Sequence, residues 1–265
     1  MASGPPIAPS TCMYCGNPAD SREHIIAVWI VELLDQDPRG LPTPTTLHVP
    51  LDDGTRLDFR GRSRRGRPTI EYTTRVCQAC NNGWMNVIDE NARPYLMPMI
   101  KGDPVGLDAT GREFVATWVA KVAVTARSAS PNVLPIEKAW TDWLYNNRVI
   151  QPNWHASVGH YIGVEPFWYR PEDVSSTPPP DAPASWQSDP IFASHGVAAF
   201  LAVGHLAIEV LGFTNGILTQ VAGPPETAML DIWPQTGIAV EWPPAEHIDD
   251  AGLHLWARRF QSKPS

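Results

Sequence analysis

Apolar residues recur at helical spacing in two stretches of the chain. In residues 21–36 a short strand-like run passes into an amphipathic pattern, which predicts a strand followed by a helix. Further along, Phe114, Trp118 and Val122 repeat every four positions, and the residues 110–113 before them match a capping box. We therefore expect a second helix that begins at residue 110. Lys121 lies on this helix and can face a functional site, but nothing in the sequence shows that it does.

Other stretches favour strands and loops. Residues 46–76 are typical of strands joined by a turn and an arginine-rich loop, and a helix should follow and stop near Ala92, before Arg93-Pro94. The proline-rich residues 170–190 predict a long mobile loop. After residue 150 the apolar runs favour strands, expected at 155–164, 197–203, 205–213 and 216–222.

The composition indicates a globular chain of one or two domains. It has 265 residues, 43% of them hydrophobic, and its 28 prolines favour short elements and long loops over a helical bundle. We expect an α+β protein with a disordered terminus at 1–10, a first module at 11–104 and a β-rich α+β accessory domain at 105–265.

The charge is unevenly distributed. The formal net charge is −8, yet residues 1–105 carry 11 basic against 12 acidic residues. Residues 56–75 are basic, with seven arginines against Asp58 and Glu71. Such a local stripe can contact a phosphate backbone, although a solvated loop is the other interpretation. The arginines we select as nucleic-acid contacts are Arg60, Arg62, Arg64, Arg65 and Arg67.

Nothing in the sequence suggests export or membrane insertion. The first ten residues contain no basic stretch followed by an apolar one, so they do not resemble a signal peptide. The longest strongly apolar run, 197–203, is too short to span a bilayer. We expect a soluble cytoplasmic protein without membrane partners, whose cysteines are reduced or metal-bound.

The four cysteines form two Cys-x2-Cys pairs, Cys12/Cys15 and Cys77/Cys80, with 61 residues between the pairs. Each pair can offer two thiolates from one tight turn, and two pairs complete a tetrahedral site for one zinc ion. Such a site leaves no position for water, so this zinc should be structural. A redox pair is the competing interpretation, but two pairs with no leftover cysteine favour one metal site.

Three motifs together resemble a known family. They are C-x2-C-G at 12–16, S-R-E-H-I-I at 21–26 and V-C-Q-A-C-N-N-G-W-M at 76–85. Residues 11–95 are in this respect similar to the HNH endonucleases (His-Me finger, ββα-metal family) whose structural zinc is bound by four cysteines. In that family a β-hairpin and a helix hold one divalent ion, and the zinc knuckles pin the hairpin to the helix.

The resemblance implies a metal-dependent endonuclease that hydrolyses phosphodiester bonds in DNA. His24 takes the place of the general base, a role that suits a side chain whose pKa lies near neutrality. Glu23 and Asn81 take the places of the ligands to the catalytic ion, and hard oxygen ligands favour Mg²⁺ or Mn²⁺. Asn82 is the alternative if the helix is rotated by one position. Cutting both strands with one site per chain would require a homodimer.

Two other interpretations stay open. His24 can be a buried structural histidine beside the zinc, in which case residues 11–95 form a catalytically silent, zinc-finger-like module that binds nucleic acid or protein. Alternatively, the module is a nuclease directed at RNA, which differs from the first hypothesis only in its substrate.

Overall fold

The computed structural model describes residues 11–36, 46–50, 56–60, 75–129, 136–164, 167–175, 195–213, 228–235, 237 and 239–257. The chain mixes helices with mainly antiparallel strands, in agreement with an α+β class. The expected disorder at 1–10 and the expected strand at 216–222 lie outside the described residues. None of the described helices combines the length and the apolar character needed to cross a membrane.

The first part of the chain contains short strands and three consecutive helical segments. The elements are β1 (Ser21–Arg22), α1 (Val28–Leu34), β2 (Thr46–Pro50), β3 (Arg56–Arg60), β4 (Arg75–Val76), α2 (Gln78–Cys80), the π-helical turn η1 (Asn81–Met85) and α3 (Asn86–Lys101). β1 pairs antiparallel with β4, Ser21 facing Val76, and β2 pairs antiparallel with β3. β4, the second strand of the pair with β1, therefore leads directly into the helical segment that begins with α2.

The second part of the chain builds a six-stranded sheet. Its elements are β5 (Val105–Leu107), α4 (Ala109–Ala129), α5 (Lys138–Asn147), β6 (His155–Tyr161), β7 (Phe167–Ser175), β8 (His195–Val203), β9 (Leu206–Phe213), β10 (Met229–Trp233), β11 (Val240–Trp242), β12 (His247–Ile248) and α7 (Asp250–Ala257). The strand order is β10-β6-β9-β8-β7, and β12 pairs parallel with the end of β6. β5 and β11 form a separate antiparallel pair.

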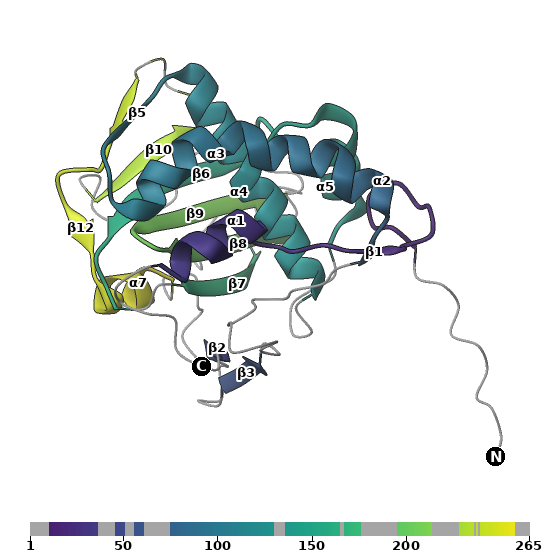
Figure 1. Ribbon diagram of the computed structural model, residues 1–265, viewed down its shortest axis with the longest axis horizontal. Helices are drawn as coiled ribbons and strands as arrows, with labels where there is room; N and C mark the ends of the chain where they lie inside the picture. Colours follow the sequence, from purple (N-terminus) through teal and green to yellow (C-terminus); the bar gives the residue numbers. More distant parts are fainter. Residues whose placement is uncertain are drawn as a thin grey trace, which may run out of the picture.

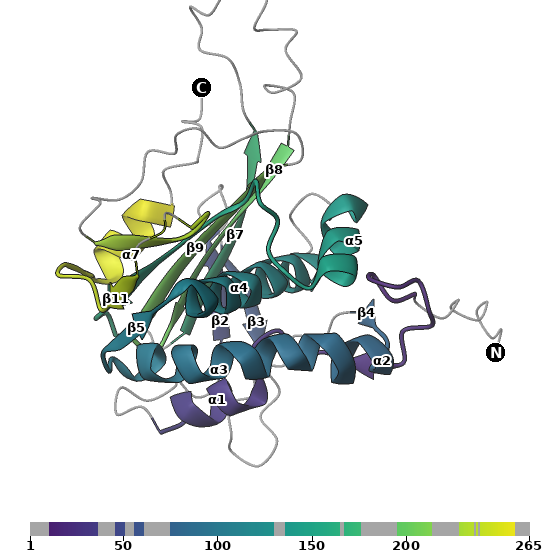
Figure 2. The same cartoon turned by 90° about the horizontal axis from the view of Figure 1, so that it is seen from above.

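Helices pack on both faces of this sheet. α4 runs along one face of the sheet, and α3 packs against α4 (Figures 1 and 2). α1 lies on the same side of the sheet as these two helices (Figure 2). Alternate residues of β8 point to the two faces, so Leu201 joins the core under α4 while Phe200 meets Trp256 of α7, 5.1 Å between ring centroids.

One continuous buried core joins the two parts of the chain. Ile26 and Leu96 from the first part belong to the same cluster as Trp118 and Ile208 from the second. The expected boundary at residue 104 lies between α3 and β5, and the core continues across it. The division into a first module and an accessory domain stays a prediction.

The helix after the second cysteine pair is longer than expected. It continues through Pro94 and Pro98 as far as Lys101, so the stop predicted at Ala92 is wrong. A proline inside a helix costs about 3 kcal/mol, and each large side chain buried against α4 contributes about 1.5–3 kcal/mol. Pro94 is exposed, whereas Leu96 and Met99 are fully buried, so packing outweighs the two prolines.

Glycine ends this helix. Gly102 has a φ of 88°, and the N–H of Asp103 donates to the carbonyl of Pro98. This left-handed ending satisfies the last carbonyls of the helix, which is the usual role of a glycine at that position.

Two other boundaries differ from the expectation. α4 begins at Ala109, and the Asp108 carboxylate accepts the N–H of Gly111, so Asp108 is the capping residue and not Thr110. Residues 167–175 form β7, so the first part of the segment predicted as a loop at 170–190 is a strand at the sheet edge. The strands expected at 155–164, 197–203 and 205–213 are confirmed as β6, β8 and β9.

Candidate metal centre and the adjoining polar cluster

The four cysteines lie together, as the spacing predicts. Cys12 and Cys15 stand in a tight turn closed by the N–H of Gly16 on the carbonyl of Cys12, while Cys77 and Cys80 flank the start of the helical segment. All four sulfur atoms lie within 4.8 Å of one another. Zinc–sulfur bonds of about 2.3 Å place tetrahedral sulfurs about 3.8 Å apart, so this cluster could hold one structural metal ion such as zinc.

The surroundings of Cys12 suit a thiolate ligand. Burial opposes its ionisation, but the backbone N–H groups of Cys15, Cys77 and Tyr14 stabilise the charged sulfur and lower the pKa of Cys12 to about 7. Three of the four cysteines are buried, and four sulfur donors leave no position for water. A metal ion held there would be structural.

The segment between the cysteine pairs is tied to the helix at several points. β1 pairs with β4, and the Asp20 carboxylate accepts the N–H of Gln78 at 2.8 Å, at the positive end of the helix. The amide of Asn81 donates from Nδ2 to Oγ of Ser21 at 2.7 Å. These contacts bring the start of the helix next to the segment that contains Glu23 and His24.

His24 is half-buried and lies after β1, in the segment that leads to α1. The strand expected at the start of residues 21–36 is shorter than the apolar run that follows it, because β1 ends at Arg22, and Ile25, Ile26 and Ala27 are all buried without the alternation of a half-buried strand. Asn81 begins the irregular turn η1, in which Gly83 leaves helical geometry, and Asn82 beside it is exposed. Distortions of this kind are frequent at functional sites.

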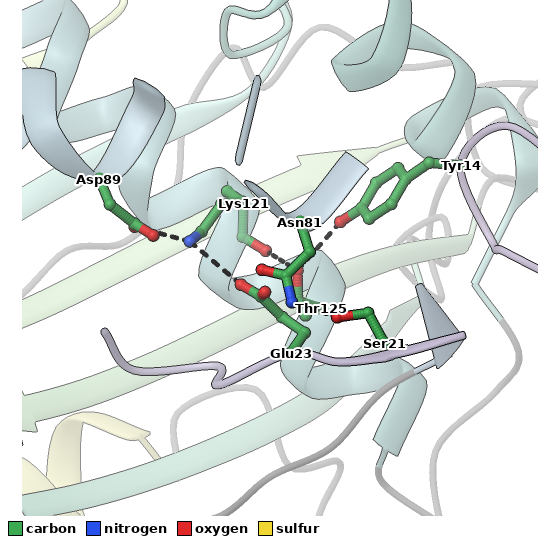
Figure 3. Close-up of polar contacts among 7 residues, drawn as sticks. All are labelled: Tyr14, Ser21, Glu23, Asn81, Asp89, Lys121 and Thr125. Atoms are coloured by element: carbon green, nitrogen blue, oxygen red, sulfur yellow. Dashed lines mark hydrogen bonds and ion pairs between the residues drawn. The ribbon is translucent and has the colours of Figure 1, made fainter. Parts of the chain in front are cut away.

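Glu23 lies in a buried cluster of charges. Its exposed fraction is 3%, and its Oε1 lies 3.6 Å from Nζ of Lys121, which also donates to Oδ1 of Asp89 at 2.6 Å. Figure 3 shows the ammonium between the two carboxylates, with the Asn81 side chain pointing toward Glu23. Burial raises the pKa of Glu23 to about 7, the Lys121 ammonium lowers it in part, and Asp89 raises it.

A second buried contact joins the first cysteine pair to α4. The hydroxyl of Tyr14 donates to Oγ1 of Thr125 at 2.9 Å, and that oxygen in turn donates to the carbonyl of Lys121 at 2.6 Å (Figure 3). Tyr14 and Thr125 are both buried. α4, from the second part of the chain, therefore contacts both the cysteine cluster and the Glu23 segment.

The resemblance to HNH enzymes predicts a divalent ion at Glu23 and Asn81, whereas among the described residues the four cysteines are the only group of three or more Cys, His, Asp or Glu side chains placed to hold a metal ion. Glu23 and Asn81 both offer hard oxygen atoms of the kind that Mg²⁺ and Mn²⁺ prefer. With both acids ionised, Glu23, Asp89 and Lys121 leave the cluster one negative charge in excess, which a further cation can balance.

Asp89 and the partners of Lys121 could not be read from the sequence motifs. The sequence offers one signal for these two residues, which is a charged side chain within an apolar stretch. Asp89 follows buried Ile88 on α3, and Lys121 lies between buried Ala120 and Val122 on α4. A charged residue on an apolar face needs a buried partner of opposite charge.

The arginines expected to contact nucleic acid lie where the structure does not describe their side chains. The backbone of Arg60 ends β3, while its side chain and the residues Arg62, Arg64, Arg65 and Arg67 lie outside the described part of the chain. No family model, curated protein or solved structure matches this chain. The function is therefore inferred from the site itself.

Proposed function

We propose that this protein is a metal-dependent endonuclease of the HNH type, which hydrolyses phosphodiester bonds in DNA. In this proposal residues 11–104 are a ββα-metal module with one structural zinc at the four cysteines. Residues 105–265 are the accessory domain, and the arginine stripe at 56–75 contacts phosphates. One site per chain would cut both strands of a duplex only as a homodimer.

One observation carries the proposal. The antiparallel pair β1·β4 leads into the helix, and the bond from Asn81 to Ser21 holds the helix start beside the Glu23-His24 segment. A ββα-metal arrangement needs two antiparallel strands followed by a helix, and β1, β4 and α2 offer these elements with α1, β2 and β3 inserted between the strands. The cysteine cluster joins the segments that precede β1 and begin the helix. These contacts support the assignment of Glu23, His24 and Asn81 to one site.

The chemistry follows from the residue types. His24 is half-buried, so it can take a proton from a water molecule that enters from solvent. Glu23 and Asn81 would hold the divalent ion, with Asn82 as the alternative on the helix. When bound, Mg²⁺ or Mn²⁺ would stabilise negative charge on the phosphate and the leaving oxygen.

A second candidate function is a catalytically silent, zinc-stabilised binding module. The burial of Glu23 favours this alternative. Its carboxylate is 3% exposed and paired with Lys121, so the side chain or its surroundings must move before an ion can bind to it. This alternative predicts binding of nucleic acid or protein that survives His24→Ala and is lost in Cys77→Ser.

A nuclease assay on the zinc-loaded full chain separates these functions. Wild type, His24→Ala and the matched control His247→Ala would be incubated with plasmid, single-stranded DNA and RNA, with Mg²⁺, Mn²⁺ or a chelator of these ions. His247 is exposed on β12 and serves as a histidine outside the proposed site.

The proposal expects metal-dependent cleavage of DNA by wild type and by His247→Ala, and none by His24→Ala. Cleavage of RNA alone would favour the RNA-directed alternative. If folded, zinc-loaded wild type cuts no substrate, the enzyme is rejected in favour of the binding module.

A further inference from the structure

Lys121 connects three separate segments of the chain. It lies on α4, its ammonium donates to Asp89 on α3, and it faces Glu23 in the segment after β1. Its side chain is fully buried, with 0% of its surface exposed. An ammonium ion in such a place is stable only when carboxylates compensate for its lost hydration.

The two carboxylates are not equivalent partners. The ammonium donates a hydrogen bond to Asp89 over 2.6 Å, while its ion pair with Glu23 spans 3.6 Å and is the weaker contact of the two. Asp89 therefore fixes the ammonium. The Glu23 carboxylate makes the longer contact to the ammonium and lies on the side of Asn81 (Figure 3).

We propose that Lys121, anchored by Asp89, is a positioning residue that sets how strongly the Glu23–Asn81 site binds a divalent cation. This inference rests on the proposed function and concerns its metal site. The Lys121 ammonium repels a divalent cation near Glu23, and the negative charge of Asp89 reduces that repulsion. When Glu23 and Asp89 are both ionised, the three side chains carry one excess negative charge, which a bound cation can balance.

The proposal predicts opposite effects for two partners of one ion pair. Lys121→Met leaves two carboxylates without the ammonium and should tighten Mn²⁺ binding on the order of tenfold. Asp89→Asn frees the ammonium to pair directly with Glu23 and should weaken binding on the order of tenfold. The double variant restores the wild-type charge and should bind Mn²⁺ within about threefold of wild type. A purely structural ion pair predicts no such opposition.

The test is a Mn²⁺ titration of the zinc-loaded full chain, with free Mn²⁺ followed by electron paramagnetic resonance. Glu23→Gln removes the ligand itself and should abolish the binding. Lys138→Met is the matched control, because Lys138 pairs with Asp142 on the surface of α5 and should leave Mn²⁺ affinity unchanged. Zinc content and circular dichroism verify that each variant is folded.

Opposite shifts in the two single variants, with a near-wild-type double variant, support the inference. Shifts in the same direction, no shift, or no Mn²⁺ binding by wild type overturn it. If Lys121→Met does not fold, Asp89→Asn and the double variant decide, since weakening in the first must be reversed in the second. Shifts without cleavage of any substrate would reject the nuclease and keep the cation site, whereas metal-dependent cleavage without the opposite Mn²⁺ shifts would keep the nuclease and reject the inference.

Discussion

Replacing Lys121 by methionine should destabilise the fold far more than the loss of a surface lysine. Methionine retains much of the apolar side chain but leaves Glu23 and Asp89 buried without a counter-charge. Breaking a buried ion pair in this way costs about 3–5 kcal/mol. Lys138, which pairs with Asp142 at 76% and 44% exposure, provides the surface reference. Its replacement should cost at most about 0.5 kcal/mol.

Thermal unfolding of zinc-saturated protein measures this difference. One kcal/mol lowers the midpoint by about 2–4 °C in a chain of this size, so Lys121→Met should unfold roughly 6–20 °C below wild type. Lys138→Met should remain within about 2 °C of wild type. Adding Asp89→Asn to Lys121→Met should recover part of the loss, because one uncompensated carboxylate disappears.

A small effect would contradict the reasoning. If Lys121→Met and Lys138→Met have the same midpoint, the ammonium is not needed to balance the two carboxylates. If the double variant is less stable than Lys121→Met alone, the cost does not come from unpaired negative charge.

Three further outcomes follow from the same contacts. Cys77→Ser should reduce bound zinc, measured by elemental analysis, from about one ion per chain to less than half. It should also lower the unfolding midpoint measured by circular dichroism. Full zinc retention would reject a site shared by the four cysteines. Tyr14→Phe removes the buried hydroxyl that donates to Thr125 and should cost about 1 kcal/mol in urea unfolding. Asn147→Ala, which removes an exposed hydrogen bond to the carbonyl of Trp143, should cost clearly less. Burial raises the pKa of Glu23 from 4.5 to about 7, so the folded state holds that proton more tightly and loses stability as the pH rises through this range. Wild type should lose about 1 kcal/mol relative to Glu23→Gln between pH 6 and pH 8, and an equal pH dependence of the two proteins would show that Glu23 titrates normally.

The sequence alone determined the features that depend on neighbours along the chain. The spacing of the cysteines is local to two tight turns, so the grouping of Cys12 and Cys15 with Cys77 and Cys80 could be predicted from it. Apolar repeats likewise identified α4 and the long strands β6, β8 and β9. The period of the apolar positions distinguishes helix from strand whichever partner later covers that face.

Tertiary packing decided the features that depend on distant segments. The helix α3 continues through Pro94 because burial of its apolar face against α4 contributes more free energy than the prolines cost. That contribution depends on α4 and cannot be read from the residues around Pro94. Asp89 and Lys121 are 32 positions apart and meet only because α3 and α4 lie side by side. The motifs therefore identified Glu23 and His24 as candidates. Packing alone placed a buried ammonium beside Glu23, because the partners of a buried charge are set by which surfaces meet and not by their order in the chain.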